Sequence, residues 1–404
     1  MICNGITLIE QLLLAIGNSL RFGFSIHFGV CLLWLCCFTT GCNTRPASPS
    51  GNESTGDYSA TGDSIRYARG FTVTSCDGYT IVEVCDPWKE GKLLQRYLLV
   101  PRENARLKAM PAGTVVRVPL RNIVVYAAVH ATVLNELDVI DEITGVCESR
   151  YIQNPKVSAR VKGGMIQDLG KSTSPDIEKM IALGTEVVIA SPFDNGSYGA
   201  VEKIGIPIIE CADYMETDPL GRAEWIKFLG LLTGKRERAD SLFRLTESNY
   251  LKTKTLTEHV SHRPKLLTEL KYGSTWYVSG GESYMARIFN DAGADYVFSH
   301  LAGRGGVPLS FETVLNSAIH ADIWLIHYNR DEAMTYHALR SDFTSYDQFD
   351  AFRQRHIYGC NTNYSLYYEE VPMHPDYLLT ELIALFHPDL LHNHSFRYFS
   401  PIKE

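Results

Sequence analysis

Two segments of this chain repeat the same order of strand and helix signals, and this repeat constrains the fold most. In the second segment, an aromatic, glycine-rich strand around Trp276 leads into a helix that ends at Gly293, and a helix from Ser310 and the apolar strand 323–326 follow. About 150 residues earlier, the strand that begins at Ile123 leads through a helix to another apolar strand. Alternating strands and helices are typical of parallel sheets covered by helices. We therefore expect an α/β fold with two Rossmann-like lobes.

The first 42 residues are typical of an export signal rather than of the fold. Arg21 precedes the apolar run 22–38, and Thr39-Thr40-Gly41-Cys42 follows it. A basic flank, an apolar core and small residues before a cleavage point define a secretory signal. Cysteine directly after glycine suits a lipoprotein signal, so we predict lipidation at Cys42. An uncleaved membrane anchor is the alternative, because the apolar run is just long enough to span a bilayer.

The residues after the signal predict a tether and two lobes. Residues 43–62 are rich in Ser, Thr, Gly, Asn and Pro and have almost no large apolar side chain, which is typical of a flexible tether. The predicted organisation is a signal at 1–42, the tether at 43–62, an N-terminal lobe at 63–215, linking helices at 216–260 and a C-terminal lobe at 261–404.

The linking segment predicts one long helix between the lobes. A first helix opens with Asp218-Pro219 and closes near Gly234, and the stretch from Lys235 to about His259 that follows contains neither glycine nor proline. About 25 residues at ~1.5 Å each would span about 37 Å. A helix of this kind favours small rocking motions over wide closure. The alternative is two helices within one continuous domain.

The cysteines do not predict a disulfide scaffold. Of the ten, four lie in the signal and Cys42 lies at its end, and the remaining five form no C-x-x-C pair. Cys76 and Cys85 could bridge a hairpin around Asp77-Gly78, and buried free thiols are the expected state of the others.

Charge and motifs argue against two functional classes. The net charge is −8 and no uninterrupted basic run is longer than Lys235-Arg236, whereas a nucleic-acid binder normally carries a basic patch. The sequence also has no G-x-S-x-G, H-E-x-x-H or C-x-x-C motif. We therefore expect no nucleic-acid partner and no enzyme.

Four segments carry a resemblance to a known family. They read SPDIEKMIALGTEVVIA, VEKIGIPII, SFETVLNSAIHADIW and PDYLLTELIALFHP. Their order and spacing over about residues 115–393 resemble the ABC-transporter substrate-binding lipoproteins of the iron-siderophore, heme and vitamin-B12 class. The chain departs from the family pattern at Gly184-Thr185-Glu186, where a Pro-Asp stretch is usual, and at Glu381, where Asp is usual.

The resemblance implies a helical-backbone binding protein without a catalytic cofactor. Its expected ligand is an iron-siderophore, heme or cobalamin, and its expected partner is an ABC permease in the inner membrane. It also implies a monomer in the periplasm, held at a membrane by the lipid on Cys42.

The candidate ligand contacts follow from sheet geometry rather than from the resemblance. Ligands of open α/β sheets lie outside the carboxyl ends of the strands. Flat aromatic side chains there suit a macrocycle or catecholate, arginine suits an anionic ligand, and histidine or tyrosine could ligate iron. No metal site of the protein's own is expected. The candidates are Tyr126, His130, Ser191, Phe193, Trp276, Tyr277, Ser283, Tyr284, Arg304, His327, Tyr328 and Arg330.

Two other hypotheses stay open at this point. One is a tetrapyrrole chelatase-like lipoprotein enzyme, for which His130 with Glu136 is the only nearby candidate pair. The other is an adhesive or signalling surface lipoprotein, which would bind no small molecule.

Overall fold

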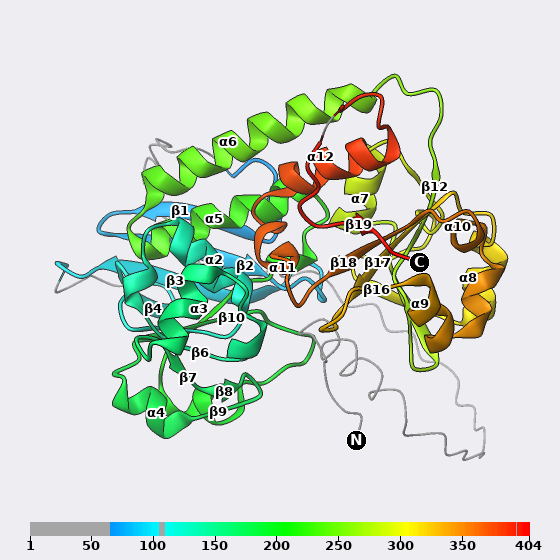
Figure 1. Cartoon of the computed structure of the whole chain (residues 1–404). Coiled ribbons are helices and arrows are strands. Elements are labelled where there is room, and N and C mark those ends of the chain that lie inside the picture. The colour runs from blue at the N-terminus through cyan, green and yellow to red at the C-terminus, as the bar shows by residue number, and fades with distance from the viewer. Residues whose placement is uncertain (1–64, 105–109, 393) are drawn as a thin grey trace, which may run out of the picture. The chain divides into compact units, whose positions relative to one another are not determined.

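The computed structural model describes residues 65–104, 110–392 and 394–404 (Figure 1). The predicted signal, Cys42 and the tether lie outside these residues. The described chain is a mixed α/β protein with two five-stranded sheets that are mainly parallel, which confirms the predicted fold class. Among the described helices, none is both long and apolar enough to cross a membrane.

An extra sheet precedes the first α/β lobe. The predicted hairpin around Asp77-Gly78 is present, and a parallel pairing adds the fourth strand. The register sets Cys76 opposite Tyr79 at the turn and leaves Cys85 at the far end of the hairpin. Both thiols are free, so the suggested bridge is wrong, because this register separates the two side chains. The strands, in sheet order, are β1 (Phe71–Cys76), β2 (Tyr79–Cys85), β3 (Leu93–Pro101) and β4 (Thr114–Val118).

The sheet of the first lobe is wholly parallel. Its inner strand β10 is apolar throughout and fully buried, as expected of a strand covered on both faces. In sheet order the strands are β11 (Ile208–Glu210), β10 (Val187–Ala190), β5 (Ile123–Val125), β6 (Ile143–Val146) and β7 (Gln167–Asp168). The helices are α2 (Ala128–Glu136), α3 (Pro155–Lys162), α4 (Ile177–Ala182) and the 3-10 helices η1 (Ile140–Glu142), η2 (Ser149–Tyr151), η3 (Gly199–Ile204) and η4 (Asp213–Met215).

One helix start differs from the pattern in the sequence. Ser174 and Pro175 suggest a cap and a first helical residue, but they form the short strand β9 (Ser174–Pro175), paired with β8 (Gly170–Lys171). Helix α4 begins two residues later, because the Asp176 side chain accepts a hydrogen bond from the Lys179 amide and caps it.

Two helices link the lobes. Helix α5 (Pro219–Thr233) is capped by Asp218, ends at Gly234 with φ +69°, and is buried on nearly all sides. Helix α6 (Arg236–Lys254) has 19 residues and buries only one face, with Phe243 and Tyr250 among its buried residues. It is therefore about 28 Å long, shorter than the sequence suggested, and a 3-10 turn, η5 (Thr255–Thr257), follows it. Helix α6 packs against α5 and α12 (Figure 1).

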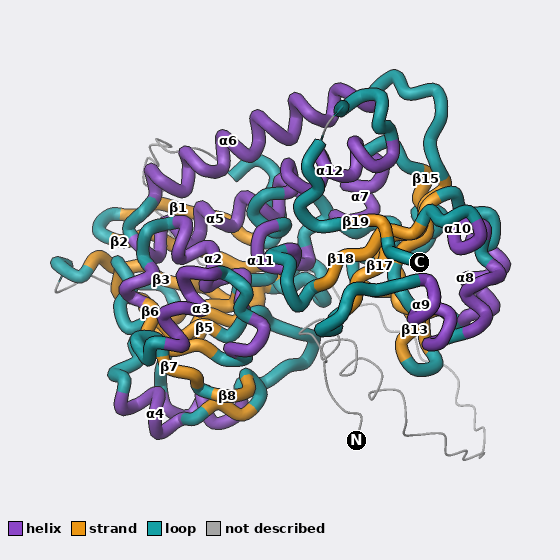
Figure 2. The backbone as a smooth tube through the Cα atoms, in the orientation of Figure 1, coloured by secondary structure: helices purple, strands orange, loops and turns teal. Residues whose placement is uncertain are grey.

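The second lobe has a five-stranded sheet and a separate three-stranded antiparallel sheet (Figure 2). In order, the larger sheet has β15 (Asp295–Tyr296), β12 (Lys265–Thr268), β17 (Ile323–Tyr328), β18 (Ile357–Asn361) and β19 (Ser400–Pro401), of which only β19 runs antiparallel. The smaller sheet has β13 (Lys271–Tyr272), β14 (Thr275–Ser279) and β16 (Gly306–Leu309). The helices are α7 (Tyr284–Asp291), α8 (Phe311–Ala318), α9 (Tyr336–Asp342), η6 (Thr344–Gln348), α10 (Asp350–Arg353), α11 (Tyr367–Glu370) and α12 (Pro375–Phe386).

Candidate ligand-binding site

Tyr126 directly follows β5 but faces the protein interior. Its side chain is 4% exposed and packs in an apolar cluster with Val124 and Val188. Its hydroxyl has no hydrogen-bond partner, and burial raises the pKa of the phenol. A phenol enclosed in this way does not contact a ligand, so the prediction for Tyr126 does not fit this structure.

His130 belongs to a buried group of charges. It lies in the first turn of α2 and is 1% exposed, and its Nε2 lies 3.5 Å from Oδ1 of Asp213. Arg222 on α5 donates from Nε to the other carboxylate oxygen of Asp213, at 3.0 Å. Burial raises the pKa of Asp213, but the charge of Arg222, followed by the close contact with His130, outweighs burial and holds that pKa below its ordinary value. His130 is therefore enclosed under the site, and the prediction that it contacts ligand is corrected.

Ser191 and Phe193 follow β10 at the carboxyl edge and both remain partly exposed. Tyr214 steadies this loop, because its hydroxyl donates to the Pro192 carbonyl at 2.6 Å. A Cβ at Gly196 would lie 2.5 Å from the Phe193 ring, so the loop needs glycine there. These two residues are the lobe-one candidates that a ligand can reach.

Trp276 is a core residue and not a ligand contact. It lies inside β14 with 0% exposure, its Nε1 donates to the Thr268 carbonyl at 3.0 Å, and its ring stacks on Trp324 at 5.6 Å. The prediction failed because β14 belongs to the small antiparallel sheet, where the rule for parallel strand ends does not apply. Tyr277, its neighbour on the opposite face of β14, is partly exposed.

The glycine turn after β14 fits tightly against a second loop. A Cβ on Gly280 would lie 2.2 Å from the Gly303 carbonyl oxygen. A Cβ on Gly281 would lie 1.9 Å from the Ser299 carbonyl oxygen. The turn therefore holds the loop that carries the exposed Arg304. Ser283, which follows the turn, is buried and caps α7 by accepting from the Ala286 amide at 3.1 Å. Ser283 thus has a structural position rather than an accessible one.

Tyr284 begins α7 and meets the linking helix α5. Arg222 donates from Nη1 to the Tyr284 hydroxyl, and its guanidinium lies 4.6 Å from the centre of the ring. Tyr284 is partly exposed, so the same side chain that contacts the buried charges is accessible from outside.

The last residues of β17 form an ordered group. His327 Nδ1 lies 2.9 Å from Oε1 of Glu269, which directly follows β12, and the His327 ring packs 4.5 Å from Tyr367. Its Nε2 is buried without a hydrogen-bond partner. Tyr328 is partly exposed and accepts from the Met334 amide at 3.1 Å. Arg330 is exposed and pairs with Asp342 on α9.

Sequence reasoning missed three residues of this region. Glu269 follows the strand 265–268 and the carboxyl-end rule would have selected it. Asp213 and Arg222 had no local signal, because only packing brings an acid of η4 and an arginine of α5 together. Within the described ranges, no three His, Cys, Asp or Glu side chains are placed to hold a metal ion.

Two hollows of the described surface lie away from the candidate residues. One, of about 450 Å³, is formed by Ile181, Gly184, Thr185, Ile204 and Ile206, at the amino ends of β10 and β11. The other, of about 220 Å³, is lined by residues of α7 and β15 together with Arg263 and Ser299. The candidates that keep accessible surface therefore line neither of these two hollows.

The two lobes are joined beside the candidate site. Glu369 of α11 is buried and accepts hydrogen bonds from the Thr132 hydroxyl at 2.5 Å, the Asn154 amide at 3.1 Å and the Gln153 amide. Its donors belong to α2 of the first lobe or directly precede α3. A carboxylate of the second lobe thus accepts hydrogen bonds from three residues of the first lobe and joins the two lobes.

Comparison with known proteins identifies the family. Residues 123–364, more than half of the chain, match the periplasmic binding protein family, and the chain belongs to it. Proteins of this family bind solutes and are not enzymes, which sets aside the chelatase hypothesis. The four-stranded sheet β1–β4 precedes the matched region.

Curated relatives cover most of the chain. A lipoprotein of Methanocaldococcus jannaschii is 25% identical over 336 residues, which span 78% of each chain. A second lipoprotein of that organism is 21% identical over 323 residues, covering 75% of this chain and 80% of the relative.

Solved structures share the fold. A periplasmic heme binding protein from Pseudomonas aeruginosa aligns with a TM-score of 0.54 and 16% identity, over 70% of this chain and 99% of its own. A protein of an ABC-type Fe3+-hydroxamate transport system from Saccharomonospora viridis aligns with a TM-score of 0.52 and 17% identity, over 66% and 92%. At these identities the likeness concerns the fold alone.

Proposed function

We propose that this protein captures an iron complex, a ferric siderophore or heme, or a corrinoid and delivers it to an ABC importer. The family membership of residues 123–364 carries the proposal. It is supported by proteins of the same fold that are named for heme and for Fe3+-hydroxamate. The protein acts by binding and release, with no chemical step.

The accessible aromatic side chains form the proposed ligand surface. Phe193 of the first lobe and Tyr277, Tyr284 and Tyr328 of the second are all partly exposed. Their flat faces suit a porphyrin, a corrin or a catecholate, since such sites combine apolar area with a few polar groups. The exposed Arg304 and Arg330 would attract carboxylates or an anionic siderophore.

The proposal includes the membrane and the partner. Lipid on Cys42 would keep the protein, as a monomer in the periplasm, close to the permease in the inner membrane. The relatives named lipoproteins support this anchoring.

The test is native mass spectrometry with an absorbance spectrum. The chain without its first 42 residues is offered hemin, cyanocobalamin and several ferric siderophores in competition. We expect one ligand retained at unit stoichiometry. A folded protein that retains none of them would overturn the proposal and favour the adhesive or signalling hypothesis.

A variant pair then tests the surface. Tyr284→Ala should lower the affinity for the retained ligand by about tenfold, because an aromatic contact contributes roughly 0.5–1.5 kcal/mol beyond its buried area. Tyr272→Ala is the control, since this exposed tyrosine of β13 lies outside the proposed surface. Equal affinity of the two variants would remove Tyr284 from the site.

A further inference from the structure

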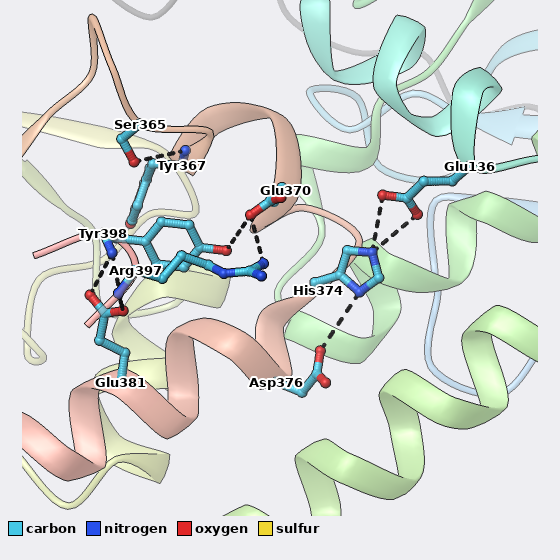
Figure 3. A network of polar contacts seen from close by, with 9 residues as sticks. All are labelled: Glu136, Ser365, Tyr367, Glu370, His374, Asp376, Glu381, Arg397 and Tyr398. Atoms are coloured by element: carbon cyan, nitrogen blue, oxygen red, sulfur yellow. Dashed lines mark hydrogen bonds and ion pairs between the residues drawn. The ribbon is translucent and has the colours of Figure 1, made fainter. Parts of the chain in front are cut away.

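His374, at the start of α12, faces carboxylates from both lobes (Figure 3). Its Nε2 lies 3.1 Å and 3.0 Å from the two carboxylate oxygens of Glu136, the last residue of α2 in the first lobe. Its Nδ1 lies 4.0 Å from Oδ1 of Asp376, in the first turn of α12. The imidazole therefore stands between an acid of one lobe and an acid of the other.

The surroundings of this group are enclosed. The side chains of His374, Glu136 and Asp376 are 14%, 22% and 3% exposed, so solvent screens their charges less than on an open surface. The Tyr377 ring is stacked on the imidazole at 4.6 Å. Two neighbours come from α6: Asn249 donates a hydrogen bond to Asp376, and Arg238 donates to the Glu136 carbonyl. Glu370 of α11 adds a further negative charge near the imidazole. Arg397 pairs with Glu370 and lies over the Tyr377 ring.

The two charge states of His374 fit this environment differently. A neutral imidazole has one N–H, and when that hydrogen points to Glu136 the bare Nδ1 faces Asp376. Oδ1 of Asp376 is buried and has no hydrogen-bond partner. An imidazolium presents an N–H to each acid and meets both charges. At 4.0 Å the contact of Nδ1 with Oδ1 of Asp376 is an ion pair rather than a hydrogen bond. The protonated form thus attracts both acids by its charge, and the neutral form does not.

The pKa of His374 agrees with the geometry. Burial lowers it, but the hydrogen bond and charge of Glu136, followed by the charges of Asp376 and Glu370, outweigh burial and raise the pKa above the ordinary 6.5. A histidine with a raised pKa adds stability that is fully present below 6.5 and is lost as the pH rises through the raised value. The contact is therefore strong in acid and weak in alkali.

The position of the pair couples it to the lobes. Helix α2 follows β5 and is held to the second lobe at two places. The first is Glu369, which accepts hydrogen bonds from the neutral donors of Thr132 and of the two residues before α3. The second contact is that of Glu136 with His374, and its strength depends on whether the histidine is protonated.

We propose that His374 and Glu136 form a proton-controlled latch between the lobes. The imidazolium fixes α2 to α12, and the neutral histidine lets the lobes rock about the Glu369 contact. Ligand exchange at the carboxyl edges is then faster at alkaline pH. This consequence rests on the proposed function, whereas the latch itself is tested without any ligand.

The test is hydrogen–deuterium exchange of the ligand-free full chain between about pH 6 and about pH 9, a range that begins below the ordinary histidine pKa and extends well above it. At each pH, the amide exchange rate of residues 128–136 and 367–376 is divided by the rate of unstructured reference peptides. This ratio removes the intrinsic pH dependence of exchange. We expect protection in wild type to fall over this range, because the contact with Glu136 is lost as the imidazolium gives up its proton. Glu136→Gln keeps an acceptor but removes the charge, so it should flatten this dependence.

A second histidine–carboxylate pair provides the control. His320 and Asp350, 2.7 Å apart, lie within the second lobe, and the His320 side chain is 75% exposed. His320→Gln should keep the wild-type pH dependence in both segments. If Glu136→Gln does not fold, His374→Gln gives the same comparison, because its amide keeps a donor to Glu136.

Two results would overturn the latch: constant wild-type protection over this pH range, or a Glu136→Gln slope equal to that of wild type. A hemin dissociation rate that rises with pH in wild type and not in Glu136→Gln would extend the latch to ligand exchange. Failure of hemin to bind would count against heme as the ligand in the proposed function and would leave the exchange result intact.

Discussion

At the scale of the residue, neighbouring side chains at the candidate site have opposite environments. Trp276 and Tyr277 are consecutive in β14, and strand side chains alternate between faces. Trp276 enters the core against Trp324, whereas Tyr277 keeps exposed area. The same contrast separates the buried His130 from the accessible Phe193. Residue type and position past a strand selected the candidates, and burial in the folded chain decides which of them remain accessible.

Trp276→Ala should destabilise the fold rather than change ligand choice. Removing a fully buried tryptophan costs roughly 3–5 kcal/mol, and the free energy of unfolding is measured with urea. Tyr272→Ala, four residues away and 45% exposed, should change it by less than about 0.5 kcal/mol. A Trp276→Ala variant of wild-type stability would show that the ring is not in the core.

At the scale of the element, tight turns and buried carboxylates place the secondary structure. The turn at Gly280 and Gly281 lets β14 pass against the carbonyls of the Arg304 loop. Buried glutamates hold chain segments through backbone amides: Glu224 accepts from Arg66, Tyr67 and Ala68, Glu216 from Arg69 and Gly70, and Glu381 from Arg397, Tyr398 and Phe399. These contacts attach the segment before β1 to α5 and to the end of η4, and the segment before β19 to α12.

Gly281→Ala tests the turn. Its Cβ would lie 1.9 Å from the Ser299 carbonyl oxygen, so the loop must shift, at a cost of about 1–3 kcal/mol. Gly305→Ala is the matched control, since nothing lies within 4 Å of its Cβ. Thermal unfolding of both variants should separate them by several degrees. Equal melting temperatures would mean that the turn tolerates a side chain.

At the scale of the whole molecule, the described lobes are held by residues far apart in the sequence. Glu136 and His374 are 238 residues apart, and Thr132 and Glu369 are 237 apart. Helices α5 and α6 supply the continuous connection, and Tyr284 meets Arg222 of α5. The fold class and the linking helices were predicted correctly from periodicity and helix-start signals, since both are local properties. The inter-lobe contacts were not, because no local pattern marks which acid meets which donor.

Glu369→Gln tests the central inter-lobe contact through pH. Burial raises the pKa of Glu369 above the ordinary 4.5, although its hydrogen bonds act in the opposite direction. The unfolded chain ionises first, so the stability from this group is present below 4.5 and is lost as pH rises through the raised pKa. Urea unfolding between about pH 4 and pH 7 should show a steeper decline in wild type than in Glu369→Gln. Parallel curves would contradict the raised pKa.

The sequence by itself determined the α/β class, the order of most strands and helices, and the carboxyl edges where candidates gather. These follow from periodicity and capping, which act over a few residues. Tertiary structure alone decided that β14 joins an antiparallel sheet, that Cys76 and Cys85 stay apart, and that Trp276 and His130 are buried. It also brought Glu136 to His374 and Arg222 to Asp213. Such outcomes depend on which distant surfaces pack together, because burial and charge pairing are set by neighbours in space rather than along the chain.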